Sequence, residues 1–145
     1  MRAIIQRVNS AVLTVDNQTI SSIGRGFLVT VGITKNDDIK SMEKLAYRLA
    51  TLRLFRDEND RLNKNITDVN GELLIVSNFT LCSTNKGGTR PDFSDSADKE
   101  KALYLYNALI DMMLEKNIPT KSGVFGAHMH ISTDLDGPVT LRLDS

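Results

Sequence analysis

The sequence predicts an α+β fold in which a mostly antiparallel, barrel-like sheet packs with two main helices. Three observations support this prediction: β-rich segments lie near both ends of the chain, two long segments have helical apolar spacing, and the elements alternate as strands, helix, strand, helix, strands. With 145 residues, the chain is expected to form a single domain over residues 1–145. No repeat, linker or low-complexity segment divides it.

The N-terminal part of the chain predicts strands joined by tight turns. Residues 2–9 and 11–16 are β-rich, and Asp16-Asn17-Gln18 supplies the turn of a hairpin. Gly24-Arg25-Gly26 then turns into residues 27–33, an apolar β-branched run typical of a buried strand. Because this Gly-x-Gly lacks the third glycine and the following helix of a dinucleotide fingerprint, we do not interpret it as a phosphate site.

Two segments have the apolar spacing of amphipathic helices. Asn36-Asp37-Asp38 offers cap residues for a first helix that extends to about Leu54, and a second helix is expected from about Ala97 to Lys116. The residues expected to face the core are Ile39, Met42, Leu45, Ala46, Leu49 and Leu52 in the first helix, and Ala102, Leu105, Leu109 and Met112 or Met113 in the second.

The remaining segments predict strands and two polar loops. Further strands are expected over residues 72–76, over 128–133 and from Val139 onward. Residues 57–65 are expected to form a loop. Residues 83–96 form a second polar segment, long enough to suggest a functional loop in so small a domain.

Charge and cysteine content limit the classes of function. Eighteen basic residues balance eighteen acidic ones, so no overall field attracts nucleic acid or an anionic membrane, and any nucleic-acid contact must be local. Cys82 is the only cysteine, which excludes an internal disulfide and fits a reducing compartment. Within residues 1–7 the apolar segment is too short for the core of a signal peptide, because Gln6 and Arg7 follow two isoleucines. No apolar segment approaches the length needed to span a membrane. We therefore expect a soluble, cytoplasmic protein.

Side chains alone offer little catalytic chemistry. His128 and His130 would share one strand face, which suits two metal ligands, but no third ligand is evident and a solvated face is the simpler interpretation. A Ser-His-Asp triad can be assembled around Ser77, yet the Gly-x-Ser-x-Gly turn is absent. Cys82 is interpreted as a small buried hydrophobe. We expect neither a metal nor a cofactor.

Gly137-Pro138 directly precedes an alternating strand pattern that neither residue favours. Proline cannot donate to a strand ladder and glycine has a large backbone entropy cost, so the pair suits a tight turn that exposes its carbonyl groups. Two interpretations remain open from spacing alone. One is a trans turn that enters an edge strand, and the other is a functional cis bond, which costs little only before proline.

A second candidate site lies where the strand over residues 72–76 ends. Ser77-Asn78-Phe79-Thr80 would present hydroxyls and backbone N–H groups, and the basic loop Lys86-Gly87-Gly88-Thr89-Arg90-Pro91 could approach phosphate through its glycines. Such a site would suit an ester next to a phosphodiester. The alternative is a capped strand end beside a surface loop.

A series of short motifs then occurs in order along nearly the whole chain. The motifs are Met1-Arg2-Ala3-Ile4-Ile5-Gln6-Arg7-Val8, Val15-Asp16, Ile23-Gly24-x-Gly26, Leu52-Arg53-Leu54-Phe55, Gly71-Glu72-Leu73-Leu74, Ser77-Asn78-Phe79-Thr80-Leu81, Gly87-x-x-Arg90-Pro91-x-Phe93, Phe125-Gly126-Ala127-x-Met129 and Asp136-Gly137-Pro138-Val139-Thr140. In this combination the sequence resembles the D-aminoacyl-tRNA deacylases, or D-tyrosyl-tRNA deacylase family.

The resemblance implies a homodimer that hydrolyses the ester between a D-amino acid and the terminal adenosine of tRNA, and also accepts glycyl-tRNA. It places the active site at the dimer interface and implies no DNA or membrane partner. It implies roles for Ser77, Asn78, Phe79 and Thr80 in catalysis and for Gly137, Pro138, Arg7, Phe125 and Met129 in substrate binding. With such a substrate, the basic loop predicts that Lys86 and Arg90 bind tRNA phosphates.

In the family, the Gly-Pro dipeptide enters from the partner subunit with a cis bond, and its carbonyl groups reject an L side chain. Here that dipeptide is Gly137-Pro138, and Arg7 matches the arginine that braces it. The family usually has Gln where this chain has Asn78, and Asn where it has Leu135. A related deacylase type carries the dipeptide in trans.

For the chemical step, the resemblance leaves two accounts of Thr80: a nucleophile, or a bystander while the 2′-hydroxyl of the tRNA assists hydrolysis. We favour the RNA-assisted account because no base lies near Thr80 in sequence, with backbone N–H groups stabilising the oxyanion. Two other classes remain as alternatives: a non-catalytic tRNA-binding translation factor on the same fold, and an esterase that uses Thr80 or Ser77 directly.

Overall fold

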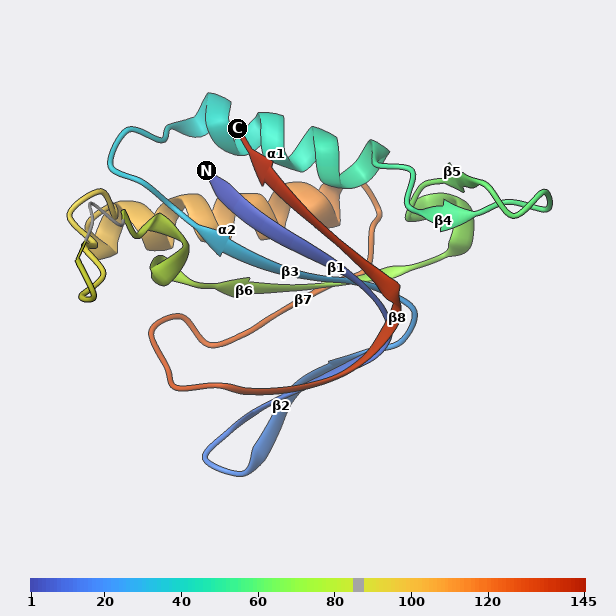
Figure 1. Cartoon of the computed structure of the whole chain (residues 1–145), viewed down its shortest axis with the longest axis horizontal. Helices are drawn as coiled ribbons and strands as arrows, with labels where there is room; N and C mark the ends of the chain where they lie inside the picture. The colour runs from blue at the N-terminus through green and yellow to red at the C-terminus, as the bar shows by residue number, and fades with distance from the viewer. Residues whose placement is uncertain (85–87) are drawn as a thin grey trace.

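Two helices lie on one side of a strongly curved sheet in the computed structural model of the chain, which confirms the predicted α+β fold (Figure 1). The structure describes residues 1–84 and 88–145. The strands are β1 (Arg2–Val15), β2 (Gln18–Ile23), β3 (Gly26–Gly32), β4 (Phe55–Arg56), β5 (Leu62–Lys64), β6 (Glu72–Ser77), β7 (Thr120–Ser122) and β8 (His130–Asp144). The helices are α1 (Ile39–Thr51) and α2 (Lys99–Glu115), with short 3-10 helices η1 (Thr67–Val69) and η2 (Phe79–Cys82). Among the described residues, no helix is both long and apolar enough to cross a membrane.

The central strand is β1, which pairs antiparallel with β2, β3 and β8. β6 instead runs parallel to β3 and to β7, because connections that contain α1 and α2 return the chain to the starting end of the sheet. The sheet is therefore mostly antiparallel, as the sequence predicts. In Figure 1, β2 and the first half of β8 curl away from the helices and give the sheet its barrel-like shape.

The sheet buries apolar side chains on both faces. The larger cluster, which includes Phe27, Phe55 and Leu105, joins the sheet to the helices, and the smaller one, which includes Leu13 and Leu74, lies within the curled part of the sheet. The buried helix residues are Met42, Leu45, Ala46 and Leu49 in α1, and Leu105, Tyr106, Leu109 and Met113 in α2. The predicted helix faces are thus confirmed, except that Ile39 at the first position of α1 is exposed.

Two predicted boundaries near α1 are wrong. The helix ends at Thr51 because Leu52 is extended, with ψ of 124°. This exit buries Leu54, whose carbonyl accepts a hydrogen bond from the buried Arg7 guanidinium. Residues 57–65, predicted as a loop, include β5 of a small hairpin with β4.

β1 and β8 are each one continuous strand where the sequence predicts two segments. Their register shows how Gly137-Pro138 is accommodated: Gln6 pairs with Thr140 and Val8 with Leu135. The four residues 136–139 therefore lie opposite the single residue 7. Such an excess is a bulge, which releases residues from the ladder without ending the strand.

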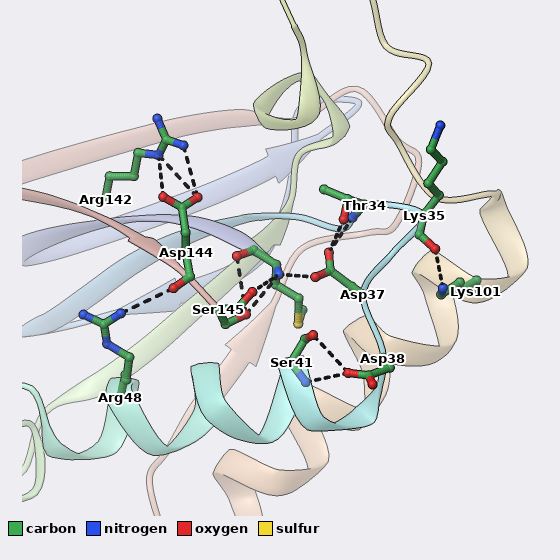
Figure 2. A network of polar contacts seen from close by, with 11 residues as sticks. Thr34, Lys35, Asp37, Asp38, Ser41, Arg48, Lys101, Arg142, Asp144 and Ser145 are labelled. Carbon is green, nitrogen blue, oxygen red and sulfur yellow. Dashed lines mark hydrogen bonds and ion pairs between the residues drawn. The ribbon is translucent and has the colours of Figure 1, made fainter.

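Asp37 does not cap α1 as the sequence suggests, because Asp38 caps it by accepting a hydrogen bond from Ser41 N at 2.8 Å. Asp37 is instead buried and forms an ion pair with the α-amino group of Met1. That amino group also donates to the Ser145 hydroxyl at 3.0 Å, so both chain ends meet beside α1 (Figure 2).

Candidate active site

A cavity of about 650 Å³ opens at the C-terminal end of β6. β3, β6, η2, the start of α2 and the segment that leads into β8 surround it. The lining residues are Thr30, Val31, Ile33, Val76, Ser77, Asn78, Phe79, Ser96, Ala97, Lys99, Ala102, Phe125, Gly126, Ala127, His128, Met129 and Ile131. Apolar and aromatic side chains with a few hydroxyl and amide groups are typical of a pocket that binds a small organic ligand.

Asn78 shapes the turn that follows β6. Its backbone N–H donates to Val31 O at 2.8 Å, which continues the pairing of β6 with β3. Its side-chain Oδ1 accepts hydrogen bonds from Thr80 N at 3.1 Å and from Thr80 Oγ1 at 2.6 Å. A short Asn side chain can fold back on its own turn in this way, so Asn78 acts as the N-cap of η2.

The same turn leaves one backbone donor free. The N–H of Phe79 has no acceptor among the described residues, whereas those of Asn78 and Thr80 each have one. Unpaired N–H groups are expected at the first positions of a helix, and here that position is at the cavity lining. This donor can bind a ligand oxygen.

The Phe79 side chain stands at the cavity with 60% of its surface exposed. The ring of Phe93 contacts it edge-on, with ring centroids 5.1 Å apart. Ser96 Oγ donates to the Phe79 carbonyl at 3.5 Å, which ties the segment before α2 to the turn. Phe79 therefore presents an exposed aromatic ring at the cavity, and contacts to Phe93 and Ser96 hold it in place.

The opposite wall runs from Phe125 to Met129 and rests on the core through Tyr106. The rings of Phe125 and Tyr106 lie 5.7 Å apart, and the Tyr106 hydroxyl donates to Ile75 O at 2.8 Å. Burial raises the pKa of Tyr106 to about 12, so this hydroxyl stays a hydrogen-bond donor at neutral pH. A Cβ at Gly123 would lie 2.6 Å from Met129 Sδ, so Met129 packs directly over that glycine.

A second, smaller groove of about 440 Å³ adjoins the first cavity. Its lining residues are Arg2, Ala3, Ile4, Thr80, Leu81, Ser83, Thr84 and Arg142. The two hollows are neighbours because Thr80 hydrogen-bonds to Asn78 and Ile4 pairs with Thr30 across β1 and β3. Thr80 thus faces the second groove.

Gly137-Pro138 lies in the β8 bulge and has a cis peptide bond. Both residues are exposed, and neither lines either hollow of its own chain. Arg7 reaches the bulge from β1: its Nε lies 2.9 Å from Asp136 Oδ2 as an ion pair. This contact lacks hydrogen-bond alignment, so Arg7 Nε has no hydrogen-bond acceptor among the described residues.

The structure brings some of the predicted site residues together and separates others. Those that share the large cavity are Ser77, Asn78, Phe79, Phe125 and Met129. Thr80 faces the second groove, while Arg7, Gly137 and Pro138 lie at the β8 bulge. Arg90 is exposed and lines neither hollow. Lys86 lies outside the described residues.

Sequence reasoning missed Ser96 and Lys99, which line the cavity from the start of α2. The Asp98 helix cap was the only local signal for their position. The rings of His128 and His130 contact each other at 5.0 Å, but the described residues contain no group of three side chains that could hold a metal ion. Burial raises the pKa of the Cys82 thiol, which fits its interpretation as a buried hydrophobe.

An α+β fold whose curved sheet carries a cavity with aromatic and amide side chains at a strand end is typical of proteins that bind a small ligand with both apolar and hydrogen-bonding parts. The comparisons with known proteins identify the family to which such a protein belongs. The sequence model of a family described as "D-Tyr-tRNA(Tyr) deacylase" matches residues 4–144. The chain belongs to this family.

Relatives match the whole chain. A protein named "D-aminoacyl-tRNA deacylase" from Clostridium novyi is 47% identical over 145 residues, covering 100% of this chain and 97% of its own. One of the same name from Thermotoga petrophila is 42% identical with the same coverage. Among solved structures, "c-Myc DNA Unwinding Element Binding Protein" has a TM-score of 0.93 and 38% identity, covering 100% of this chain and 99% of that chain. "Structural Analysis of a probable eukaryotic D-amino acid tRNA deacylase" has a TM-score of 0.85 at 17% identity, covering 99% and 98%, and shows the fold alone.

Proposed function

We propose that the protein hydrolyses the ester bond of D-aminoacyl-tRNA, and also that of mischarged glycyl-tRNA, and releases the free amino acid and tRNA in the cytoplasm. Family membership and the names of its relatives support this activity. The structural observation that carries it is the cavity that joins Ser77-Asn78-Phe79 to Phe125 and Met129. Its apolar wall suits an adenine base, and its strand-end turn suits an ester.

In this proposal, the ester carbonyl accepts a hydrogen bond from the free N–H of Phe79. This donor is fixed by the η2 turn, so it is already in place when negative charge develops on the carbonyl oxygen. Asn78 contributes by holding the turn through its contacts to Thr80. The shorter Asn therefore suffices where the family usually has Gln.

Thr80 is not the nucleophile in this proposal. Its hydroxyl contacts the Asn78 amide oxygen at 2.6 Å, and no described histidine or carboxylate hydrogen-bonds to it. Without a base, a threonine hydroxyl is a weak nucleophile at neutral pH. The 2′-hydroxyl of the terminal ribose lies next to the ester in any aminoacyl-tRNA, so the substrate supplies the assisting group and no cofactor is needed.

The chiral filter is proposed to come from a second subunit. Gly137-Pro138 is exposed and lines neither hollow of its own chain, while the groove beside Thr80 stands open next to the proposed ester site. A two-fold dimer would place the dipeptide of each chain at the site of the other. Rigid carbonyl groups there would admit a hydrogen atom and reject an L side chain.

A mixed-dimer experiment tests this arrangement. A Phe125→Leu chain has a damaged cavity and a Gly137→Ala chain a damaged filter, so a dimer of the two would contain one intact site out of two. Random pairing makes half of the dimers mixed, so co-expression of two strongly impaired chains should restore about a quarter of the wild-type activity. No recovery, or sedimentation of a fully active monomer, would refute the shared site.

The central activity is tested by incubation with D-Tyr-tRNA, L-Tyr-tRNA and Gly-tRNA. We expect hydrolysis of the D-ester and the glycyl ester while the L-ester survives. Phe125→Leu should slow hydrolysis, whereas Tyr47→Leu, which removes an exposed aromatic ring from α1, should not. Binding of tRNA without hydrolysis would favour a translation factor instead.

One comparison raises a different nucleic-acid partner. The 38% identical solved structure carries a name that refers to a DNA unwinding element. The balanced charge of this chain does not favour binding along a DNA duplex, because such binding depends on many cationic contacts to phosphate. Because the family description and the names of the curated relatives refer to tRNA, we propose tRNA and not DNA as the partner, and duplex DNA is the control competitor in the tRNA assay.

A further inference from the structure

Lys99 is the one lysine, arginine or carboxylate side chain among the described residues that line the large cavity. We propose that its ammonium group binds the phosphate on the 5′ side of the terminal adenosine, forming a subsite at the mouth of the cavity. This inference rests on the proposed function, because it assigns a position to one phosphate of the same substrate. It adds a binding residue that neither the sequence motifs nor the cavity's aromatic wall indicated.

The first support is that Lys99 is free. It makes no hydrogen bond or ion pair with any described residue. The nearby lysines differ: Lys101 Nζ donates to Lys35 O at 2.7 Å (Figure 2), and Lys35 Nζ lies 3.7 Å from Asp95 Oδ1. An unpaired ammonium group beside a cavity without carboxylates attracts an anion.

The second support is the position of Lys99. Asp98 caps α2, and the segment before it is fixed by two contacts, Ala97 N to Ile33 O at 3.0 Å and Ser96 Oγ to Phe79 O at 3.5 Å. These contacts hold the start of α2 beside Phe79, at the cavity that Phe125 and Met129 also line. A nucleoside with its base on the aromatic wall and its ester at Phe79 N–H would leave its 5′ phosphate at this mouth.

The arginines of the second groove are less available. Arg2 Nη1 donates to Leu81 O at 3.2 Å, and Arg142 Nε lies 3.0 Å from Asp144 Oδ2. Their charge is therefore already engaged by acceptors within the chain. A phosphate that needs a free cation is better placed at Lys99 than in the second groove.

The test uses two small esters that differ by one phosphate: 3′-O-(D-tyrosyl)-adenosine and the same 3′-ester of adenosine 5′-monophosphate. For the wild type, kcat/KM should be higher for the phosphorylated ester, mainly through KM. Lys99→Ala should reduce this preference about tenfold, near the lower end of the effect of one charge-assisted contact because Lys99 is exposed. Lys99→Arg should keep most of it, and the exposed Lys116→Ala should leave it unchanged.

Calorimetry of adenosine and adenosine 5′-monophosphate separates this inference from the proposed function. If the wild type prefers the monophosphate and Lys99→Ala abolishes that preference, the subsite is supported even when neither ester is hydrolysed. Lack of hydrolysis would contradict the deacylase proposal alone. If the wild type and Lys99→Ala have the same preference for the phosphorylated ligand in both kinetics and calorimetry, the subsite proposal is wrong, while the proposed hydrolase activity is unaffected.

Discussion

Gly137→Ala should damage the proposed filter through local backbone strain. Gly137 has a φ of +133°, a conformation that residues with a side chain rarely adopt. A Cβ built there would lie 2.6 Å from Val139 N and 2.9 Å from Val139 Cγ2, closer than carbon atoms tolerate. The backbone of residues 137–139 must therefore shift. We expect a loss of about 1–3 kcal/mol in the free energy of unfolding.

That loss corresponds to a fall of about 3–10 °C in Tm for a chain of this length. The assays are thermal unfolding and hydrolysis of D-Tyr-tRNA, in which activity should fall by more than unfolding explains at the assay temperature. Gly24→Ala is the matched control, because a Cβ there would meet only Glu72 Oε2 at an ordinary 3.7 Å. If Gly137→Ala keeps both the wild-type Tm and the wild-type activity, the strain argument is wrong.

Three further predictions concern chemistry, pH and salt. Thr80→Ala should keep activity within about tenfold, and EDTA should have no effect; a loss of several orders of magnitude or inhibition by the chelator would contradict RNA-assisted hydrolysis. Because the pKa of Tyr106 is raised to about 12, its stabilising effect is present below the unfolded value near pH 10 and is lost as pH rises toward 12. In denaturant titrations, the wild type should therefore lose about 1.4 kcal/mol per pH unit in that window relative to Tyr106→Phe, and parallel curves would refute this. Arg90→Ala should weaken binding of all tRNAs alike and reduce the salt slope by about one; an unchanged slope would return Arg90 to the role of a surface residue.

The sequence predicted what depends on local periodicity. The core faces of α1 and α2 follow from apolar residues spaced at helical intervals, so Met42, Leu45 and Leu109 are buried as expected. The turn after β6 was also predictable, because polar residues follow an apolar run. What could not be predicted depends on partners distant in sequence. Asp37 looks like a cap residue until the α-amino group of Met1 is seen beside it.

The candidate site shows the same division. Ser77-Asn78-Phe79 was predicted from the polar residues that follow a buried strand, and Phe125 from the family resemblance; the structure shows that both lie on one cavity at the end of β6. Lys99 was not predicted as a site residue, because its neighbours in sequence do not distinguish it from an ordinary surface lysine in the first turn of a helix. Only the cavity lining sets it apart.

A buried arginine supports the β8 bulge that carries Gly137-Pro138. Leu135, two residues before Gly137, is 43% exposed and offers the bulge no polar side chain. Arg7 lies opposite the bulge, is only 4% exposed, and contacts both Asp136 and the Leu54 carbonyl. A buried guanidinium without acceptors is strongly unfavourable, so Arg7 favours the conformation that keeps Asp136 beside it. The residue next to the dipeptide is thereby tied to the core by an ion pair.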